Sequence, residues 1–310
     1  MKLTIALGGN AIIQPGQRGT AKEQFANVLS TSKQIGQLVD DGHEVVVTHG
    51  NGPQVGNILI QQDRARNTVP AMPLDVCGSQ TQGFIGYMLQ NSLYNVFAGL
   101  GLEKNVATVV TQVLVDKEDD AFDNPTKPVG PFYDKEHAEK MVEEKNENWI
   151  EDSGRGWRKV VPSPIPERIV EAPIINDLVR NGEIVIASGG GGIPVIEEDG
   201  KIHGVEAVID KDRAGCILAE EIDSDIFLVL TDVSNAYVNY GQKDEEALGE
   251  ISVQEIKEHI EKGHFGEGSM KPKVQAAVDF VESGGEMAII TSISEVLDAI
   301  NGNAGTRITR

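Results

Sequence analysis

The sequence is poor in cysteine, in positive charge and in long apolar runs, and each shortage excludes a class of protein. The 310 residues include only two cysteines, far apart and without metal-ligand spacing, so neither a disulfide framework nor a zinc site is expected. Lysine and arginine total 27 against 48 acidic residues, and the net charge of −21 predicts no binding to nucleic acid or to a membrane surface. No apolar stretch approaches the roughly 18 residues of a membrane span, and the apolar start is too short for a signal peptide, so we expect a cytoplasmic protein.

Several common catalytic motifs are also missing. The chain has no GxxxxGK[ST] pattern, which excludes a P-loop, and Gly8-Gly9 does not continue into GxGxxG, which makes a dinucleotide dehydrogenase a weak interpretation. No Ser/His/Asp or Cys/His order with a nucleophile elbow is present, so acyl-enzyme chemistry has no support. His49 could donate to an anion, but a structural histidine with a hydrogen-bonded ring is the favoured interpretation.

The sequence does contain a repeated pattern in which an apolar run ends in glycine or a small polar residue. The four runs are residues 3–7 before Gly8-Gly9-Asn10, 45–48 before Gly50-Asn51-Gly52, 184–187 before four glycines, and 227–230 before Thr231-Asp232. Buried parallel strands are apolar on both faces, and ligands collect where such strands end. Because glycine lets backbone N–H groups approach a ligand closely, the pattern predicts a site for a phosphate or a small carboxylate.

Helical and extended segments alternate along most of the chain. A capping box at Thr20 and Glu23 starts a helix that ends near Gly42, and further helices are expected at 77–100, 173–181 and 252–262. Strands are expected at 106–111, 183–188, 225–231 and 286–291, with a hairpin turn at Asp199-Gly200. Repeated βα units predict an α/β fold, an open three-layer αβα sandwich with a mainly parallel central sheet. We expect an N-terminal lobe at residues 1–215 and a C-terminal lobe at 216–310.

The alternation stops between residues 117 and 163. This stretch carries several prolines, both tryptophans and a charged helical piece at 134–147, so we expect a small protruding subdomain inserted into the N-terminal lobe. A basic cluster of Arg155, Arg158 and Lys159 surrounds Trp157. In so acidic a chain, we interpret this cluster as part of the subdomain's own fold, with anion binding as the less favoured alternative.

Three lysines stand in rigid settings. Lys127 lies between two prolines, Lys211 directly follows Asp210, and Lys273 follows another proline. Phosphoryl transfer needs the phosphate and its acceptor held in line, with cations over the phosphate oxygens, and immobilised lysines together with Mg²⁺ can supply these. Asp210 is explained equally well as the partner that orients the lysines and as the N-cap of the next helix.

Longer stretches resemble the carbamate kinases, a branch of the amino acid kinase family. In chain order they are Ala6–Ala11, Thr48–Asn57, Asn124–Phe132, Gly154–Pro164, Gly189–Val195, Gly204–Asp212 and Gly263–Lys273. The match extends from the first expected strand to the last expected helix. The lysine framed by prolines, Lys127, separates the carbamate kinases from other members of that family.

The resemblance implies reversible phosphoryl transfer between ATP and carbamate, which gives carbamoyl phosphate and ADP. In fermenting cells it implies ATP synthesis from carbamoyl phosphate, in the breakdown of arginine or a related compound. It further implies a homodimer, and Mg²⁺ bound through the nucleotide phosphates rather than in a metal site of the protein. Carbamate is already an oxyanion, so the lack of a candidate general base agrees with this reaction.

The same resemblance assigns roles to individual residues. The catalytic group would be Lys127, Lys211, Lys273 and Asp210, with Asp210 organising the lysines. Transferred phosphate would be held by Gly8, Gly9 and Asn10, and carbamate by Gly50, Asn51 and Gly52. The nucleotide would contact Thr231, Asp232, Val233, Tyr237, Ser269 and Met270.

The sequence departs from the family pattern in two places, and two alternatives stay open. The end of the chain around residues 301–305 is shorter and less familiar than the rest. Lys271 stands where an apolar residue is expected, so an additional positive charge is predicted near ATP. The residues by themselves do not distinguish carbamate from another small carboxylate. The alternatives are another kinase of the family that forms an acyl phosphate on an amino acid, and a catalytically silent nucleotide-binding sensor.

Overall fold

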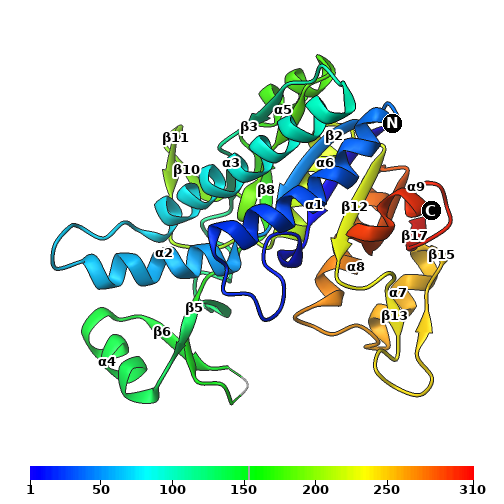
Figure 1. Cartoon of the computed structure of the whole chain (residues 1–310). Helices are drawn as coiled ribbons and strands as arrows, with labels where there is room; N and C mark the ends of the chain where they lie inside the picture. Colours follow the sequence, from blue (N-terminus) through cyan, green and yellow to red (C-terminus); the bar gives the residue numbers. More distant parts are fainter. Residues whose placement is uncertain (153) are drawn as a thin grey trace.

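The centre of the molecule is one eight-stranded sheet (Figure 1). Its strand order is β15-β17-β16-β12-β1-β2-β9-β3. The computed structural model describes residues 1–152 and 154–310. Neighbouring strands run parallel throughout this sheet except β16 and β17. The strands are β1 (Lys2–Leu7), β2 (Glu44–His49), β3 (Val106–Thr108), β9 (Ile184–Ile186), β12 (Ile226–Thr231), β15 (Glu250–Ser252), β16 (Met287–Ser292) and β17 (Thr306–Thr309). The predicted mainly parallel sheet is therefore confirmed.

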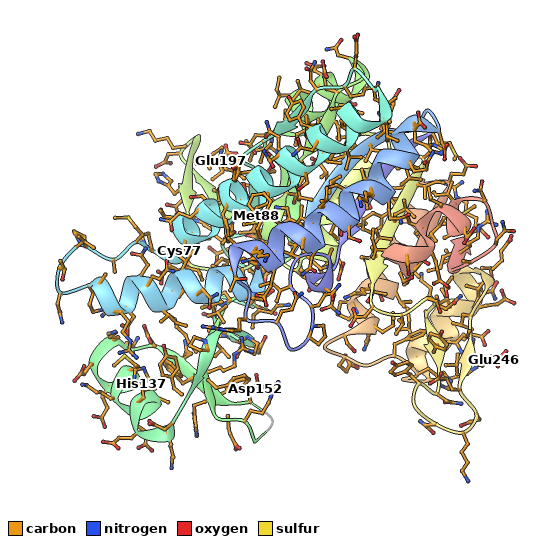
Figure 2. All side chains as sticks on the ribbon, viewed as in Figure 1. Cys77, Met88, His137, Asp152, Glu197 and Glu246 are labelled. Carbon is orange, nitrogen blue, oxygen red and sulfur yellow. The ribbon has the colours of Figure 1, made fainter. Side chains whose placement is uncertain are left out.

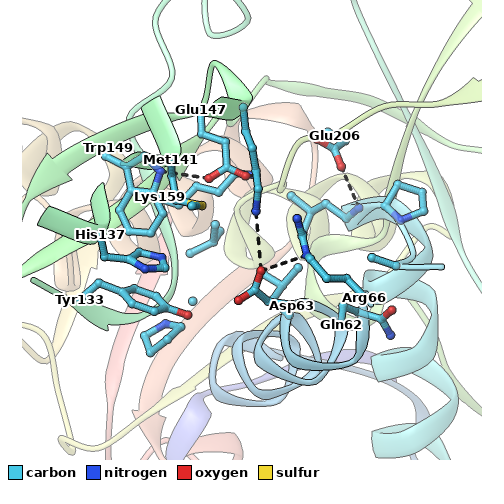
Figure 3. Close-up of a pocket in the computed structure, with 18 of the residues that line it drawn as sticks. Gln62, Asp63, Arg66, Tyr133, His137, Met141, Glu147, Trp149, Lys159 and Glu206 are labelled. Atoms are coloured by element: carbon cyan, nitrogen blue, oxygen red, sulfur yellow. Dashed lines mark hydrogen bonds and ion pairs between the residues drawn. The ribbon is translucent and has the colours of Figure 1, made fainter. Parts of the chain in front are cut away.

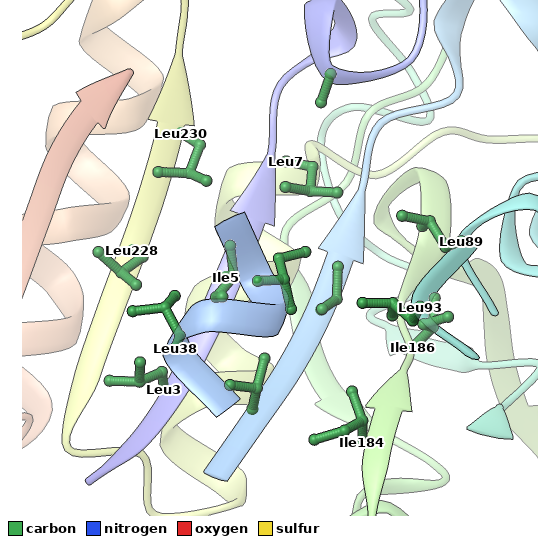
Figure 4. Packing of buried hydrophobic residues seen from close by; sticks show 14 of the residues in the cluster. Leu3, Ile5, Leu7, Leu38, Leu89, Leu93, Ile184, Ile186, Leu228 and Leu230 are labelled. Atoms are coloured by element: carbon green, nitrogen blue, oxygen red, sulfur yellow. The ribbon is translucent and has the colours of Figure 1, made fainter. Parts of the chain in front are cut away.

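Helices cover both faces of the sheet, which completes the predicted three-layer sandwich. On one face lie α1 (Ala21–Asp40), α3 (Leu74–Leu100) and α9 (Val296–Ile300), and on the other α5 (Ala172–Arg180), α6 (Lys211–Glu221) and α8 (Met270–Ser283). Successive strand residues alternate between the faces: Leu3, Ile5 and Leu7 pack under α1, as Figure 4 shows, whereas Ala6 packs toward α6 and α8. Each such buried aliphatic side chain contributes about 1.5–3 kcal/mol relative to exposure.

Local sequence signals explain where several elements begin and turn. Thr20 and Glu23 form the predicted capping box at the start of α1, and Ser252 and Glu255 form another at the start of α7 (Val253–Glu261). The hairpin of β10 (Ile193–Glu198) and β11 (Lys201–Gly204) turns at Asp199 and Gly200, whose φ angles are +50° and +71°. The predicted turn is confirmed, and φ > 0 at both positions is what a type I′ turn, a common two-residue hairpin loop, requires.

The expected strand at 106–111 was only partly correct. β3 ends at Thr108, and the chain then leaves the central sheet because Thr111 turns away to bond the buried side chain of Gln82. The next strand, β4 (Gln112–Val115), joins a second sheet in the order β11-β10-β4-β8, in which β8 is Pro166–Ile169. Helix α8 and strands β15 and β17 were not predicted, since α8 begins at Met270 without a side-chain cap and the strands are short.

A small subdomain protrudes from the sandwich below α2 (Gly52–Ala65), in green in Figure 1. Its three-stranded sheet, in the order β5-β7-β6, consists of β5 (Lys127–Tyr133), β6 (Asn148–Glu151) and β7 (Trp157–Val161), and α4 (Lys135–Lys145) packs against it. In Figure 2, His137 and Asp152 mark this subdomain, and Glu246 marks the distant C-terminal lobe. Residues 117–126 lie against the sandwich instead, where Phe122 packs on the core beside α5 and α6.

The remaining elements are short. They are the 3₁₀ turns η1 (Gly9–Ala11), η2 (Gly189–Gly191) and η3 (Ile293–Glu295), and the strand pair β13 (Tyr237–Val238) and β14 (Glu246–Ala247). Cys77 and Cys216 are both buried and unbridged. Within residues 1–152 and 154–310, the helices are all too short or too polar to cross a membrane.

Candidate active site

Two adjoining cavities open where β1, β2 and β12 end. The large cavity has a volume of about 760 Å³ and the small cavity about 370 Å³. Gly9, Lys211, Gly268 and Lys273 line both, so a molecule in one cavity can reach a molecule in the other. The first turns of α2, α6 and α8 contribute lining residues, and helix N-termini favour anions.

The small cavity lies between the turn that follows β2 and the protruding subdomain. Gly50, Asn51 and Gly52 form one wall, and Lys127 and Asp210 lie across from them. The Asn51 side chain donates to Thr81 Oγ1 at 2.8 Å. A Cβ at Gly190, whose φ is +69°, would lie 2.2 Å from the Asn51 amide nitrogen, so glycine is required there for the Asn51 side chain to keep its place.

The large cavity lies between the end of β12 and the start of α8. Its lining includes all six residues predicted to contact a nucleotide, namely Thr231, Asp232, Val233, Tyr237, Ser269 and Met270. Gly8 lies at its inner end, and a Cβ there would come within 2.8 Å of the Leu230 carbonyl oxygen. Three residues that the sequence did not mark as ligand contacts also line this cavity, namely Tyr240, Lys262 and His264.

The three predicted lysines converge, and each is held by a carboxylate. Lys211 Nζ lies 2.5 Å from Asp212 Oδ1, and Lys273 Nζ lies 3.3 Å from Asp212 Oδ2. Lys127 Nζ reaches down from β5 to Asp210 Oδ2 at 3.2 Å. Asp212 is only 3% exposed, so its charge is available chiefly to the two lysines that it joins.

Asp210 performs both of the tasks that the sequence left open. Its carboxylate caps α6 by accepting from the backbone N–H groups of Asp212 and Arg213, and it also pairs with Lys127. Burial by itself would raise the pKa of Asp210, but the Lys127 charge and these hydrogen bonds outweigh burial and hold that pKa below its ordinary value. Asp210 is therefore ionised at neutral pH.

His49 is a structural histidine, which confirms the favoured interpretation. Its ring is buried beneath the turn after β2, and Nδ1 donates to the Gly50 carbonyl oxygen at 2.9 Å. Burial, with a smaller contribution from the charge of Lys211, lowers the pKa of His49 to about 4. The ring is therefore neutral near pH 7 and adds no positive charge to the site.

Two predicted positions lie elsewhere. Asn10 lines a neighbouring pocket of about 290 Å³, not the two joined cavities. Lys271 does not line the large cavity, because its ammonium turns to Glu267 at 2.8 Å on the surface of α8. The expected additional charge at the nucleotide site is therefore paired and directed away.

Two further residues line the small cavity, of which the sequence indicated only Arg158, and only as the less favoured alternative of anion binding. Asp212 stands in the first turn of α6, where acidic residues are common, so its position in the sequence does not mark it as a site residue. Arg158 lines the small cavity while donating to the carbonyl oxygens of Pro128 and Gly130, so the basic cluster serves the subdomain's fold and also faces the site. The pairing of Asp212 with Lys273 joins residues 61 positions apart, which no local signal predicts.

The site offers little for a tightly held metal ion. Among the described residues, no group of three or more histidine, cysteine, aspartate or glutamate side chains is arranged to hold one. Asp232 is the one carboxylate among the described residues of the large cavity. Since Mg²⁺ commonly binds through substrate phosphates with one or two carboxylates and several waters, this donor set fits a magnesium ion brought by a nucleotide.

The sandwich fold and the glycine-rich strand ends define a class of protein. Comparison with known proteins agrees, because the model of the amino acid kinase family matches residues 1–292. The chain belongs to that family and, within it, to the carbamate kinases. Carbamate kinases of Thermococcus kodakarensis and Pyrococcus furiosus are 57% and 54% identical to it, over 100% and 99% of this chain and 99% and 98% of theirs. Like these relatives, it is a phosphotransferase enzyme.

A solved structure agrees over the whole chain. Carbamate kinase from Giardia lamblia, bound to AMP-PNP, is 48% identical with a TM-score of 0.95, covering 99% of this chain and 98% of that one. The N-acetylglutamate synthase of Neisseria gonorrhoeae, at 14% identity and a TM-score of 0.59, shares the fold alone. The recognised resemblance to carbamate kinases is thus confirmed.

Proposed function

We propose that the site transfers a phosphoryl group between ATP in the large cavity and carbamate in the small cavity. The observation that carries this proposal is the shared boundary of the two cavities, where Gly9, Lys211 and Lys273 line both. A phosphate placed at that boundary lies beside two ammonium groups and a glycine turn. In-line transfer needs this arrangement of cations around the moving group.

On the nucleotide side, the base lies near Tyr237 and Met270, and the phosphates extend along Thr231 and Asp232 toward Gly8 and Gly9. The first N–H groups of a 3₁₀ turn have no partner within the turn, so η1 directs free donors from Gly9 and Asn10 toward the phosphate region. Asn10 lines the neighbouring pocket, which shares Gly8, Thr231 and Asp232 with the large cavity, and it contributes to the phosphate region through its backbone N–H. Ser269, at the start of α8, supports the same region.

On the acceptor side, carbamate lies against Gly50, Asn51 and Gly52, with Lys127 above it. Its oxygen is already anionic and attacks phosphorus without losing a proton, so no general base is needed. As the bond to the nucleotide breaks, Lys211 and Lys273 stay beside the transferring oxygens because Asp212 holds them. Charges placed before the reaction lower its barrier without reorganisation.

Asp232 would hold a magnesium ion brought by the nucleotide, and that ion would supply neutralisation of phosphate charge. The chain itself places Asp232 on one side of the phosphates and the lysines Lys211 and Lys273 on the other side. The lobes at 1–215 and 216–310 divide this work: the first holds the acceptor, and the second holds the nucleotide. The subdomain within 117–163 covers the acceptor.

In the cell, we propose ATP synthesis from carbamoyl phosphate and ADP in the cytoplasm, as in fermentation of arginine or a related compound. The enzyme acts as a homodimer that buries an apolar face. Leu29 of α1 and Phe84, Tyr87 and Tyr94 of α3 are exposed on one face, and exposed apolar patches mark interfaces. Tyr87→Glu should yield monomers in sedimentation, whereas a monomeric wild type would exclude the dimer.

The deciding experiment measures ATP formation from ADP and carbamoyl phosphate in a coupled assay. The forward reaction is run beside it with carbamate, acetylglutamate, glutamate and aspartate as acceptors. We expect turnover with carbamoyl phosphate and carbamate only. Turnover with an amino acid acceptor instead would identify another acyl-phosphate kinase, and nucleotide binding without any turnover would identify a sensor.

A further inference from the structure

A third cavity, the rear cavity, lies on the other side of strand β5 from the small cavity. Its volume is about 390 Å³, and its walls come from α2, the segment that enters α3, and the subdomain (Figure 3). Lys127, Lys211 and Lys273 do not line it. The proposed phosphoryl transfer makes no use of this space, which is large enough for a small ligand.

One wall of the rear cavity is aromatic. The rings of Tyr133 and His137 stack with centroids 4.2 Å apart and an interplanar angle of 10°, and Trp149 meets both rings edge-on. Met141 adds a buried thioether behind them. A continuous wall of this kind accepts a flat ring by stacking.

The opposite corner carries an excess of positive charge. Arg66 Nε and Lys145 Nζ both approach the same oxygen of Asp63, at 3.2 Å and 3.6 Å, so two cations share one carboxylate (Figure 3). Lys159, by contrast, has Glu147 as its own partner at 3.2 Å. The Asp63 corner by itself therefore has one more positive than negative charge, which suits the acid group of a ligand. Glu206, which also lines the cavity, accepts from the backbone N–H of Leu74 at 3.2 Å and balances the charge of the lining as a whole.

Tyr133 adds a hydrogen-bond donor between the aromatic wall and this corner. Its hydroxyl makes no hydrogen bond to any described residue, and Figure 3 shows it directed toward Asp63. Burial, followed by the charge of Asp63, raises the pKa of Tyr133, so the hydroxyl stays protonated and can donate to an acid group.

The rear cavity and the small cavity share a wall. Val129 and Gly130 of β5 line both, and Lys127 begins the same strand. At Gly130, φ is +73° and the strand register shifts, while Arg158 ties the Gly130 and Pro128 carbonyl oxygens to β7. A molecule that bridges α2 and the aromatic wall would hold β5, and with it Lys127, in the position seen here.

We propose that the rear cavity is a regulatory site for a small planar aromatic molecule with one negative charge, and that its occupancy favours binding of the acceptor. The flat ring packs against the aromatic wall of Tyr133, His137 and Trp149, and the acid group lies between Arg66, Lys145 and the Tyr133 hydroxyl. The effect on the acceptor rests on the proposed role of Lys127, but binding in the cavity does not.

Binding is tested first, by fluorescence. The sequence has two tryptophans, so Trp157→Phe leaves Trp149 as the only reporter, inside the rear cavity. Benzoate and nicotinate are titrated beside benzamide and nicotinamide, which have similar rings without the charge. We expect a saturable change for the two acids alone, with Kd roughly millimolar for molecules so small.

A pair of matched variants on α4 locates the binding. Lys145→Ala, in the same Trp157→Phe background, should weaken benzoate binding at least several-fold. Lys140→Ala should leave it unchanged, because Lys140 pairs with Glu144 on the outer surface of the same helix. The absence of a saturable change with either acid, or equal binding to both variants, would overturn the site.

Coupling is tested separately, by kinetics in the wild type. Saturating benzoate should lower KM for carbamoyl phosphate a few-fold and leave KM for ADP unchanged. Binding with no change in KM would overturn the regulatory effect. If Lys127→Ala alone left KM for carbamoyl phosphate unaltered, the proposed role of Lys127 would fail while the binding site would stand, so the two failures are distinguishable.

Discussion

The three lysines of the site are anchored in two different ways. Lys211 and Lys273 project from α6 and α8, are 18% and 17% exposed, and share the buried carboxylate of Asp212. Lys127 projects from the protruding subdomain, is 43% exposed, and meets the capping residue of a helix. Two of the positive charges are therefore fixed before a substrate arrives, whereas the third depends on where the subdomain stands.

This difference separates two kinds of contribution. A charge fixed in the sandwich stabilises the transition state at no cost in reorganisation, so its loss should appear in kcat. A charge on an element that closes over the acceptor contributes to binding and to closure, so its loss should appear in both KM and kcat.

The largest effect should follow from removing either fixed charge. We expect Lys211→Met and Lys273→Met each to lower kcat by roughly 10²–10³, the usual loss for one preorganised donor. Steady-state kinetics measure this loss, and thermal melts should show that both variants fold. Lys257→Met, at an exposed ion pair on α7, is the matched control and should change stability by less than about 0.5 kcal/mol. Near-normal turnover in both site variants would contradict the role of fixed charges.

Removing the charge of Lys127 should affect the binding of carbamoyl phosphate and of ADP differently. Lys127→Ala should lower kcat by a factor of roughly 10² and weaken the binding of carbamoyl phosphate. The affinity for ADP, which binds in the large cavity, should stay within a few-fold of the wild-type value. Isothermal titration with each ligand measures the split. Equal losses for both ligands, or no loss for either, would show that Lys127 does not act at the acceptor end.

The positions of the two fixed lysines, Lys211 and Lys273, should in turn depend on Asp212. Asp212→Asn leaves two largely buried ammonium groups without their shared anion, and loss of a buried partner costs about 3–5 kcal/mol. We expect a lower melting temperature and a kcat reduced by about 10- to 100-fold through misplacement of both lysines. The double variant Asp212→Asn, Lys273→Met should melt higher than Asp212→Asn alone, since one of the repelling charges is gone. Additive losses would argue against a shared ion pair.

Much of the fold could be predicted from sequence because its signals are local. The capping box at Thr20, the φ > 0 turn at Asp199-Gly200 and the apolar strands each depend on residues close in the chain. The strand at 106–111 was mispredicted because its end is set by Gln82 from α3, which is distant in sequence. Helix α8 was missed because no side chain caps it.

The candidate site was predictable for a different reason. Its residues follow strand ends or stand in long recognisable stretches, and all of them except the Asn10 side chain line the two joined cavities. Their mutual pairing was not predictable, because Asp210 and Asp212 are nearly adjacent and look alike in sequence. Only the direction of each side chain shows that one meets Lys127 and the other meets Lys211 and Lys273.

Substitutions at Gly8 and Gly9, in the turn beside the fixed lysines Lys211 and Lys273, should have milder effects. A Cβ at Gly9 meets nothing within 4 Å, whereas one at Gly8 would press on the Leu230 carbonyl oxygen. Gly9→Ala should therefore fold normally and lose roughly tenfold in kcat/KM, because its methyl group would misplace the phosphate. Gly8→Ala should lower the melting temperature instead. An active Gly9→Ala enzyme with unchanged nucleotide affinity would make that turn purely structural.

The smallest expected effect is the pH dependence of stability that comes from the buried ring of His49. His49 has a pKa of about 4 in the folded chain, against 6.5 for an unperturbed imidazole, so below pH 6.5 the unfolded chain binds a proton that the folded chain does not. Stability should therefore fall as pH drops from 6.5 to 4, by about 3 kcal/mol at most from this group. His49→Asn keeps a donor near the position of Nδ1 for the Gly50 carbonyl oxygen. This variant should lack the part of the acid-induced loss of stability that comes from His49. The check is urea unfolding of both proteins at several pH values, in which the difference in unfolding free energy should shrink toward low pH. A constant difference across this range would mean that the His49 ring is protonated in the fold, beside Lys211, and that the fixed charges of the site tolerate another cation.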